Sequence, residues 1–113
     1  MRKRSRTQLE FAVSVAKNAK IKAMAYYNLG IFHDNNAREA LALPNYRKAL
    51  SLGLSGVTKS RCFAWFVSSL YKTGKYKEAL RNIQQSQKIT KDKQLLKFLT
   101  SLKQRITRNS SIL

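Results

Sequence analysis

The amino-acid sequence predicts an all-α fold, built as a short solenoid of about six helices. The clearest evidence lies around Gly74, where one apolar helical pattern ends and another begins. Phe63 and Phe66 recur at helical spacing before this glycine, and Ala79 and Ile83 do so after it. Glycine adopts left-handed backbone without a steric penalty, so it commonly ends a helix. The segment therefore predicts a helical hairpin.

An internal repeat is the second observation. Six positions in the first part of the chain fall at the spacings of six positions found 37 residues later. The matched positions are Tyr26, Leu29, Gly30, Ala42, Tyr46 and Ala49, against Phe63, Phe66, Val67, Ala79, Ile83 and Ser86. Two hairpins of like construction are typical of an α-solenoid.

This pattern resembles the tetratricopeptide repeat (TPR), whose first helix has a large residue followed by Leu-Gly. The first copy has Tyr26, Leu29 and Gly30 at these positions, whereas the second has Val67 where glycine is usual. The stretch around Pro44 is also similar to a group of short bacterial TPR proteins with a proline in the second helix. The resemblance covers residues 20 to 108 and implies a scaffold that supplies no reaction.

The expected organisation is a single TPR-like domain over residues 7–108 between two short tails. Its parts are a basic flexible tail at 1–6, repeat 1 at about 23–54, repeat 2 at about 60–90, a capping helix at about 93–108 and a frayed tail at 109–113. The expected core comprises Leu29, Ala42, Tyr46, Phe63, Phe66, Leu70, Ala79, Ile83, Leu95 and Leu99. The capping helix should turn Lys93, Lys97, Lys103 and Arg105 to solvent.

Several helix ends can be predicted from local chemistry. Thr7 and Glu10 have the spacing of a capping box at the start of the first helix. Asn36 is expected to cap the helix of the first repeat that contains Pro44, and the proline should kink that helix or, alternatively, begin a new first turn. Residues 51–57 contain two glycines and are expected to form a loop.

Charge is the extreme feature of the composition. The chain has 23 Lys and Arg residues against 5 Asp and Glu residues, a formal net charge of +18. Such a balance favours contact with nucleic acid or a ribosome, with another polyanion, with an acidic protein or with an anionic membrane surface. Lys72, Lys75, Lys77 and Arg81 cluster around one predicted turn and form a candidate anion-binding patch, although solvated helix faces explain most isolated lysines. No RNA-binding motif is present, so binding would lack sequence specificity.

An enzymatic function is not indicated, because acids, bases and ligands are scarce. His33 is the only histidine, and no metal-ligand spacing accompanies it, so a surface or turn-packing role is expected. Cys62 could be a nucleophile activated by neighbouring cations, but a lone cysteine is more often a packing residue. The glycines do not form a phosphate-binding loop. The sequence therefore predicts a protein without a catalytic site, metal or cofactor.

The resemblance also implies where a partner would bind, since TPR folds hold ligands in the groove lined by the first helix of each hairpin. The groove positions carried over are Tyr27, Asn28, Ile31, Asp34 and Asn35 in the first copy, and Ala64, Trp65, Ser68, Tyr71 and Lys72 in the second. Some chaperone-binding TPRs hold a C-terminal carboxylate with Lys and Asn, but Tyr27 and Ile31 occupy those positions here. The resemblance implies an aromatic groove for a peptide or helix of another protein; alternatively, these side chains simply cover neighbouring helices.

The compartment is the last expectation. A single cysteine excludes an internal disulfide and fits a reducing environment, so we expect a cytoplasmic location. No uncharged apolar run approaches the roughly 18 to 20 residues that cross a bilayer. Polar residues interrupt any secretion signal after the basic start, while an organellar targeting helix stays an alternative. Apolar edges on the end helices are also compatible with self-association.

Overall fold

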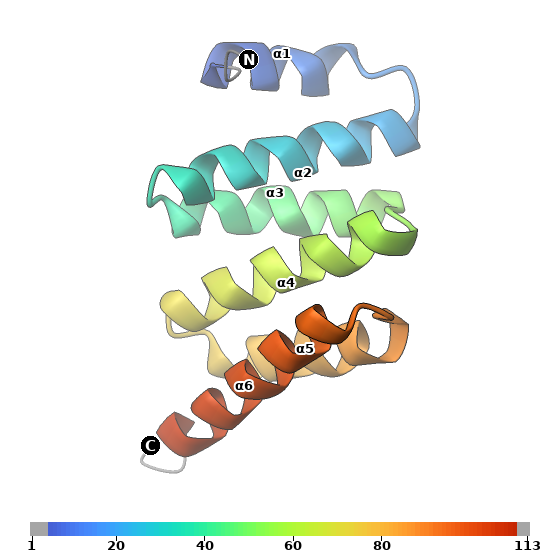
Figure 1. The fold of residues 1–113 in the computed structure, drawn as a ribbon. Coiled ribbons are helices and arrows are strands. Elements are labelled where there is room, and N and C mark those ends of the chain that lie inside the picture. The colour runs from blue at the N-terminus through green and yellow to red at the C-terminus, as the bar shows by residue number, and fades with distance from the viewer. Residues whose placement is uncertain (1–4, 111–113) are drawn as a thin grey trace. The chain divides into compact units, whose positions relative to one another are not determined.

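The computed structural model describes residues 5–110, and these form six helices without a strand. In chain order the helices are α1 (Arg6–Val15), α2 (Ala19–Asn35), α3 (Glu39–Leu52), α4 (Gly56–Lys72), α5 (Tyr76–Ile89) and α6 (Lys93–Ser110) (Figure 1). The predicted all-α fold is confirmed, as are the two hairpins, which are α2 with α3 and α4 with α5. Residues 1–4 and 111–113, parts of the expected tails, lie outside the described range.

The chain divides into two compact units between Leu54 and Ser55. In unit 1, α2 packs against both α1 and α3. In unit 2, α4 and α5 pack against each other, and α6 packs against both. Each unit thus combines one hairpin with one further helix.

The start of α1 differs from the prediction. Ser5, not Thr7, caps the helix, and Gln8 rather than Glu10 completes the capping box. Because the helix begins at Arg6, Ser5 and Arg6 belong to folded structure and not to the expected tail. Glu10 instead forms an ion pair with Arg6 one turn earlier, at 3.6 Å.

The turn of the first hairpin also differs from the prediction. Asn36 does not cap α3; it ends α2, and its side-chain amide donates to the Phe32 carbonyl. Ala37 takes the left-handed conformation at φ 56°, and Arg38 precedes α3 without a side-chain cap. Pro44 lies inside a helix that runs unbroken from Glu39, so the alternative of a new first turn is wrong.

The connection between α3 and α4 is shorter than expected. The loop predicted at residues 51–57 is reduced to Gly53–Ser55, since α3 continues to Leu52 and α4 begins at Gly56. Gly53 and Gly56 both have positive φ, 102° and 58°. In unit 2, Gly74 has φ 78°, which confirms the left-handed stop between α4 and α5.

Helix α6 is longer than expected at its C-terminal end. Asp92 caps it by accepting from the backbone N–H groups of Gln94 and Leu95, at 2.9 and 3.2 Å. Asn109, expected to fray, is helical, and its side chain donates to the Tyr71 hydroxyl at 3.2 Å. Of the expected core, every residue is buried except Leu95, which stays partly exposed because it lines a surface hollow. The four basic residues expected on the outside of α6 are all exposed.

Candidate functional site

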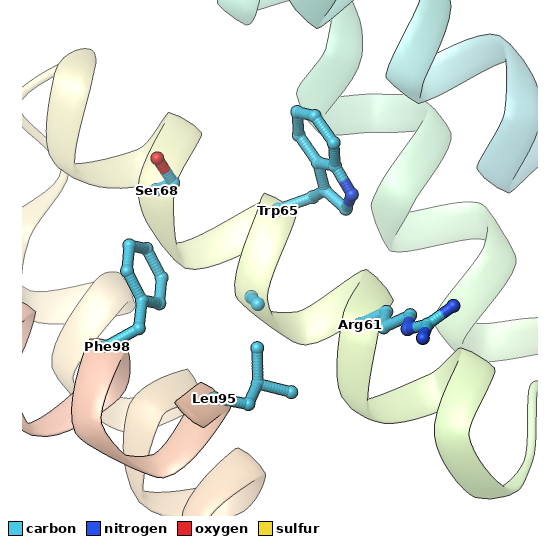
Figure 2. A pocket seen from close by; sticks show the side chains of 6 residues that line it. Arg61, Trp65, Ser68, Leu95 and Phe98 are labelled. Carbon is cyan, nitrogen blue, oxygen red and sulfur yellow. The ribbon is translucent and has the colours of Figure 1, made fainter. Parts of the chain in front are cut away.

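One face of α4 stays partly open to solvent opposite the first half of α6. The side chains on this face are Arg61, Ala64, Trp65 and Ser68, which recur at intervals of three and four residues and so share one side of the helix. Two side chains from α6, three residues apart, face them. Together they line a cavity of about 310 Å³, and the lining residues are Arg61, Ala64, Trp65, Ser68, Leu95 and Phe98 (Figure 2).

The walls of this cavity are aromatic. Trp65 projects from α4, whereas Leu95 and Phe98 project from α6 (Figure 2). Trp65 and Phe98 keep 36% and 41% of their surface exposed, respectively, although both are large and apolar. Arg61 lies toward the start of α4 and Ser68 toward its end, so polar groups occur at the two ends of an apolar hollow.

A second hollow of about 320 Å³ adjoins the first where α4 begins and α5 gives way to α6. The two hollows share Arg61 and Leu95, and we call them together the α4/α6 groove. The second is lined by Gly56, Val57, Ser60, Arg61, Ile89, Lys91, Asp92 and Leu95. Val57 and Ile89 are exposed there, at 65% and 39%. The apolar surface of the groove thus continues past Arg61.

The charge at this end of the groove is positive. Arg61 and Lys91 are exposed, and neither forms an ion pair with any residue between 5 and 110. Asp92 is the acidic residue lining the groove, and its carboxylate accepts two backbone hydrogen bonds at the start of α6. A carboxylate at the start of a helix also interacts favourably with the positive end of the helix dipole. This end of the groove therefore has two cations, Arg61 and Lys91, against the single carboxylate of Asp92.

The structure brings together only some of the predicted groove residues in unit 2. Trp65 and Ser68 line the groove, as does Ala64. Tyr71 lines neither hollow; its hydroxyl accepts from Asn109, and its ring lies 5.6 Å from that of Tyr76. Lys72, at the last position of α4, is exposed and also lines neither hollow. Tyr71 thus ties the ends of α4 and α6 together.

The predicted groove residues of the first copy all lie on α2 in unit 1. Tyr27 keeps only 8% of its surface exposed, which leaves little of its ring for a partner. Ile31 is half-buried, whereas Asn28 and Asn35 are exposed. For this copy, a role in partner binding stays a prediction.

In the first hollow, sequence reasoning missed Arg61, Leu95 and Phe98. It predicted none of the further residues of the second hollow, which are Gly56, Val57, Ser60, Ile89, Lys91 and Asp92. A signal for the two on α6, Leu95 and Phe98, was available. Leu99, Leu102 and Ile106 each follow Phe63, Phe66 and Leu70 by 36 residues, and all six are buried. Helix α6 therefore repeats the buried pattern of α4, which marks it as a further first helix whose open face should line a groove.

The candidate anion-binding patch surrounds the Gly74 turn, as its sequence positions require. Lys72, Lys75, Lys77 and Arg81 are all exposed. The last three line one shallow hollow together with Gly74, Tyr76 and Glu78. Three cations thus converge on a small surface that also contains one carboxylate.

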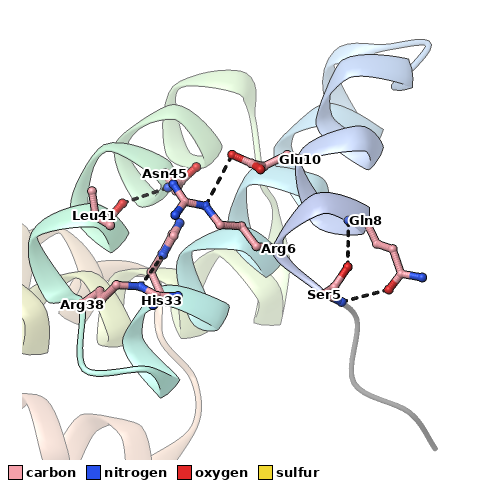
Figure 3. A network of polar contacts seen from close by, with 8 residues as sticks. All are labelled: Ser5, Arg6, Gln8, Glu10, His33, Arg38, Leu41 and Asn45. Carbon is pink, nitrogen blue, oxygen red and sulfur yellow. Dashed lines mark hydrogen bonds and ion pairs between the residues drawn. The ribbon is translucent and has the colours of Figure 1, made fainter.

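The two residues considered for chemistry are both buried. Burial raises the pKa of Cys62 to about 12, so the hypothesis of an activated thiolate is wrong. His33 accepts a hydrogen bond at Nδ1 from Arg38 Nε at 3.3 Å, beside the Arg6–Glu10 pair of α1 (Figure 3). Burial, and then the charges of Arg38 and Arg6, lower the pKa of His33. His33 is therefore a buried packing residue near the C-terminal end of α2.

Neither a metal site nor a membrane-spanning segment is found within residues 5–110. No three His, Cys, Asp or Glu side chains gather there as metal ligands, and no helix there has the length and apolar character to cross a bilayer. A family model described as tetratrico peptide repeat matches residues 23–104, from α2 into α6. No curated protein and no solved structure matches the chain.

Proposed function

Because the chain belongs to the tetratricopeptide repeat family, we propose that it is an interaction module whose α4/α6 groove binds a peptide or helix of another protein. Repeats of this family generally mediate protein–protein interaction and form scaffolds that are not enzymes. The α4/α6 groove belongs wholly to unit 2, so the proposal depends on the packing of α4, α5 and α6 alone.

One observation supports this assignment above the others. Unit 2 has four large apolar residues that remain exposed among its described residues, and all four line the α4/α6 groove: Val57, Trp65, Ile89 and Phe98. Scattered exposed apolar side chains are ordinary, but a contiguous set in a hollow is typical of a binding site. Tryptophan and other aromatic residues also dominate the binding energy of protein interfaces.

The first experiment uses Trp65, which is the only tryptophan of the chain and therefore a built-in fluorescent reporter of the groove. Partners are captured from a nuclease-treated lysate at moderate salt and then titrated against the purified chain. We expect partner binding to shift the Trp65 emission. Phe98→Ala should weaken binding about thirty-fold, as removal of an interface anchor does.

The matched control is Thr100→Ala, an exposed residue on the same helix that lines a different hollow. It should bind as the wild type does. If captured partners bind the Phe98→Ala variant with wild-type affinity and leave the Trp65 emission unchanged, the groove is not the binding site.

A second candidate function is binding of nucleic-acid phosphates without sequence specificity. Its support is the convergence of Lys75, Lys77 and Arg81 on one hollow, with Lys72 exposed nearby at the end of α4. Phosphate contacts need point charges in no particular arrangement. A folded turn also holds its charges in place, so they lose less conformational entropy on binding than charges on a flexible segment would.

Salt dependence separates the two candidates. Binding of a short single-stranded RNA should weaken steeply as the salt concentration rises. The triple change Lys72→Glu, Lys75→Glu and Lys77→Glu should make the plot of log binding constant against log salt concentration less steep, by about one for each phosphate that is no longer neutralised. Deletion of residues 1–4, which leaves the Ser5 cap intact, should do less. A wild-type slope in the triple variant together with loss of binding in the deletion would remove the turn as the anion site.

A further inference from the structure

The α4/α6 groove is not chemically uniform along its length, and this difference bears on the partner it can take. Between Arg61 and Ser68 its lining is apolar and aromatic, with Trp65 on α4 and Phe98 on α6 (Figure 2). The other end of the groove lies along Gly56 to Arg61 of α4. The exposed side chain of Lys91 also lines this end. One end therefore offers aromatic anchors, and the other offers cations beside the apolar side chains of Val57 and Ile89.

The backbone of the groove walls offers a partner little hydrogen bonding. Along the first hollow both walls are helix interiors, whose N–H and C=O groups are paired within each helix. Only at the second hollow does the first turn of α4, which has no side-chain cap, offer N–H groups without a partner inside the helix. An extended peptide would bring one donor and one acceptor per residue against this apolar surface, and leaving them unpaired is costly. A helix pairs its own backbone groups, so it can enter the groove without that cost.

The length of the groove suits such an occupant. Its lining residues on α4 run from Gly56 to Ser68, which corresponds to about 18 Å, or a little over three helical turns, at the usual rise per residue. A partner helix of this length presents apolar side chains at positions i, i+3 or i+4, and i+7 on one face. Trp65 and Phe98 are placed to receive such anchors.

The positive charge at one end of the groove favours particular residues at one end of the partner helix. Arg61 and Lys91 have no ion pair with the residues between 5 and 110, and the one carboxylate lining the groove, that of Asp92, is used in capping α6. The described part of unit 2 has two acidic residues, Glu78 and Asp92, against a large excess of Lys and Arg. Complementary charges increase association rates and favour one orientation of a partner.

We infer that the α4/α6 groove takes an amphipathic helix of another protein, whose apolar face packs between Trp65 and Phe98 and whose acidic end meets Arg61 and Lys91. This inference rests on the proposed function and specifies the partner class for the same groove. It concerns only the groove and not the cationic turn around Gly74.

The test uses the full chain and a displayed library of 18-residue peptides, a length of roughly five helical turns. Positions i, i+3, i+4 and i+7 are varied among apolar residues, and the two terminal turns are varied among Asp, Glu, Asn, Gln, Lys and Ser. Selected peptides should be enriched in Asp or Glu in one terminal turn. Trp65→Ala and Phe98→Ala should each weaken their binding about thirty-fold.

The charge contribution is measured with Arg61→Glu and Lys91→Glu, which should each weaken an acidic peptide about three- to ten-fold, and less so at high salt. The matched control is Arg105→Glu, an equal change of charge at an exposed α6 position that lines neither hollow of the groove. Replacing the acids of a selected peptide by Asn or Gln should remove its sensitivity to Arg61→Glu.

Different outcomes reject different parts of the inference. Selected peptides without acidic enrichment and unaffected by Arg61→Glu would reject the acidic partner while leaving the groove as a binding site. Selected peptides that keep their affinity after a central residue is replaced by Pro would reject the helical occupant, because proline disrupts a helix interior. If no selected peptide depends on Trp65 or Phe98, the proposed function of the groove itself fails.

Discussion

The ring of Tyr46 in α3 packs directly against the backbone of Gly30 in α2. A Cβ atom built on Gly30 would lie 2.5 Å from Tyr46 Cε1 and 2.7 Å from Cδ1, closer than side chains tolerate. Tyr46 is fully buried, and its hydroxyl donates a hydrogen bond to Asp34. The ring therefore has little freedom to move aside, and the two helices meet where one of them lacks a side chain.

Replacing Gly30 with alanine should therefore destabilise the chain. Alanine is the better helix former by about 1 kcal/mol, but overpacking of a buried contact costs about 1 to 3 kcal/mol and should outweigh that gain. Urea denaturation followed by circular dichroism measures the change. The control is Asn28→Ala on the exposed side of the same helix, which should be nearly neutral. A midpoint for Gly30→Ala at or above that of the wild type would contradict the close contact.

The second hairpin makes a similar prediction at Ala79, which is completely buried in α5. Ala79→Phe should lower the free energy of unfolding by about 1 to 3 kcal/mol, because the larger side chain forces α4 and α5 apart. Gln84→Phe, an exposed position on the same helix, is the control. Equal denaturation midpoints for the two variants would show that the register of the hairpin is wrong.

Gly74 should be intolerant of side chains for a conformational reason. Its φ is 78°, and no atom lies within 4 Å of a Cβ built there, so the cost of substitution comes from the backbone alone. Gly74→Ala should destabilise by about 1 to 2 kcal/mol. Gly74→Asn should cost less, since Asn tolerates left-handed backbone better. Equal losses for the two variants in urea denaturation would count against a backbone origin.

Acidification should destabilise unit 1 through His33. Its pKa is lowered in the folded state, so the folded chain holds this proton less tightly than the unfolded chain does. The associated stability is present above the usual pKa of 6.5 and is lost as pH falls through 6.5 toward the lower folded value. The groups facing His33 are Arg38, Arg6, Glu10 and Asp34, of which the two arginines disfavour the proton.

Urea midpoints compared at pH 8 and pH 5.5 test this dependence. The wild type should lose stability between the two values, whereas His33→Gln, which cannot titrate in this range, should lose less. The same loss in both proteins would assign the pH dependence to other groups.

Cys62 should react with thiol reagents only when the chain unfolds. The side chain is fully buried, and its pKa of about 12 leaves almost no thiolate at pH 8. Colorimetric labelling at pH 8 should therefore be very slow in the native state and rapid in denaturant. Native labelling as fast as that of an exposed cysteine would contradict the burial of Cys62.

Local patterns in the sequence were enough to predict the helical character of the chain, both hairpins and nearly all of the core. These features depend on local periodicity and on Gly74, because glycine takes left-handed backbone without a steric penalty. The start of the first helix was wrongly predicted from sequence, because Ser5 and Thr7 both have side chains that can cap a helix. Which of them is used depends on where the helix begins, and both choices leave Leu9 in the helix.

The side chains that form the groove, in contrast, are selected by packing between helices. Leu95 and Phe98 lie three residues apart on α6, and their periodicity is that of any buried stripe. Helix α6 packs against both α4 and α5, and its rotation leaves these two side chains facing the open side of α4. Tyr71, expected beside Trp65, instead hydrogen-bonds Asn109, 38 residues away. Helical spacing specifies which residues share a face, whereas packing between helices decides whether that face is covered.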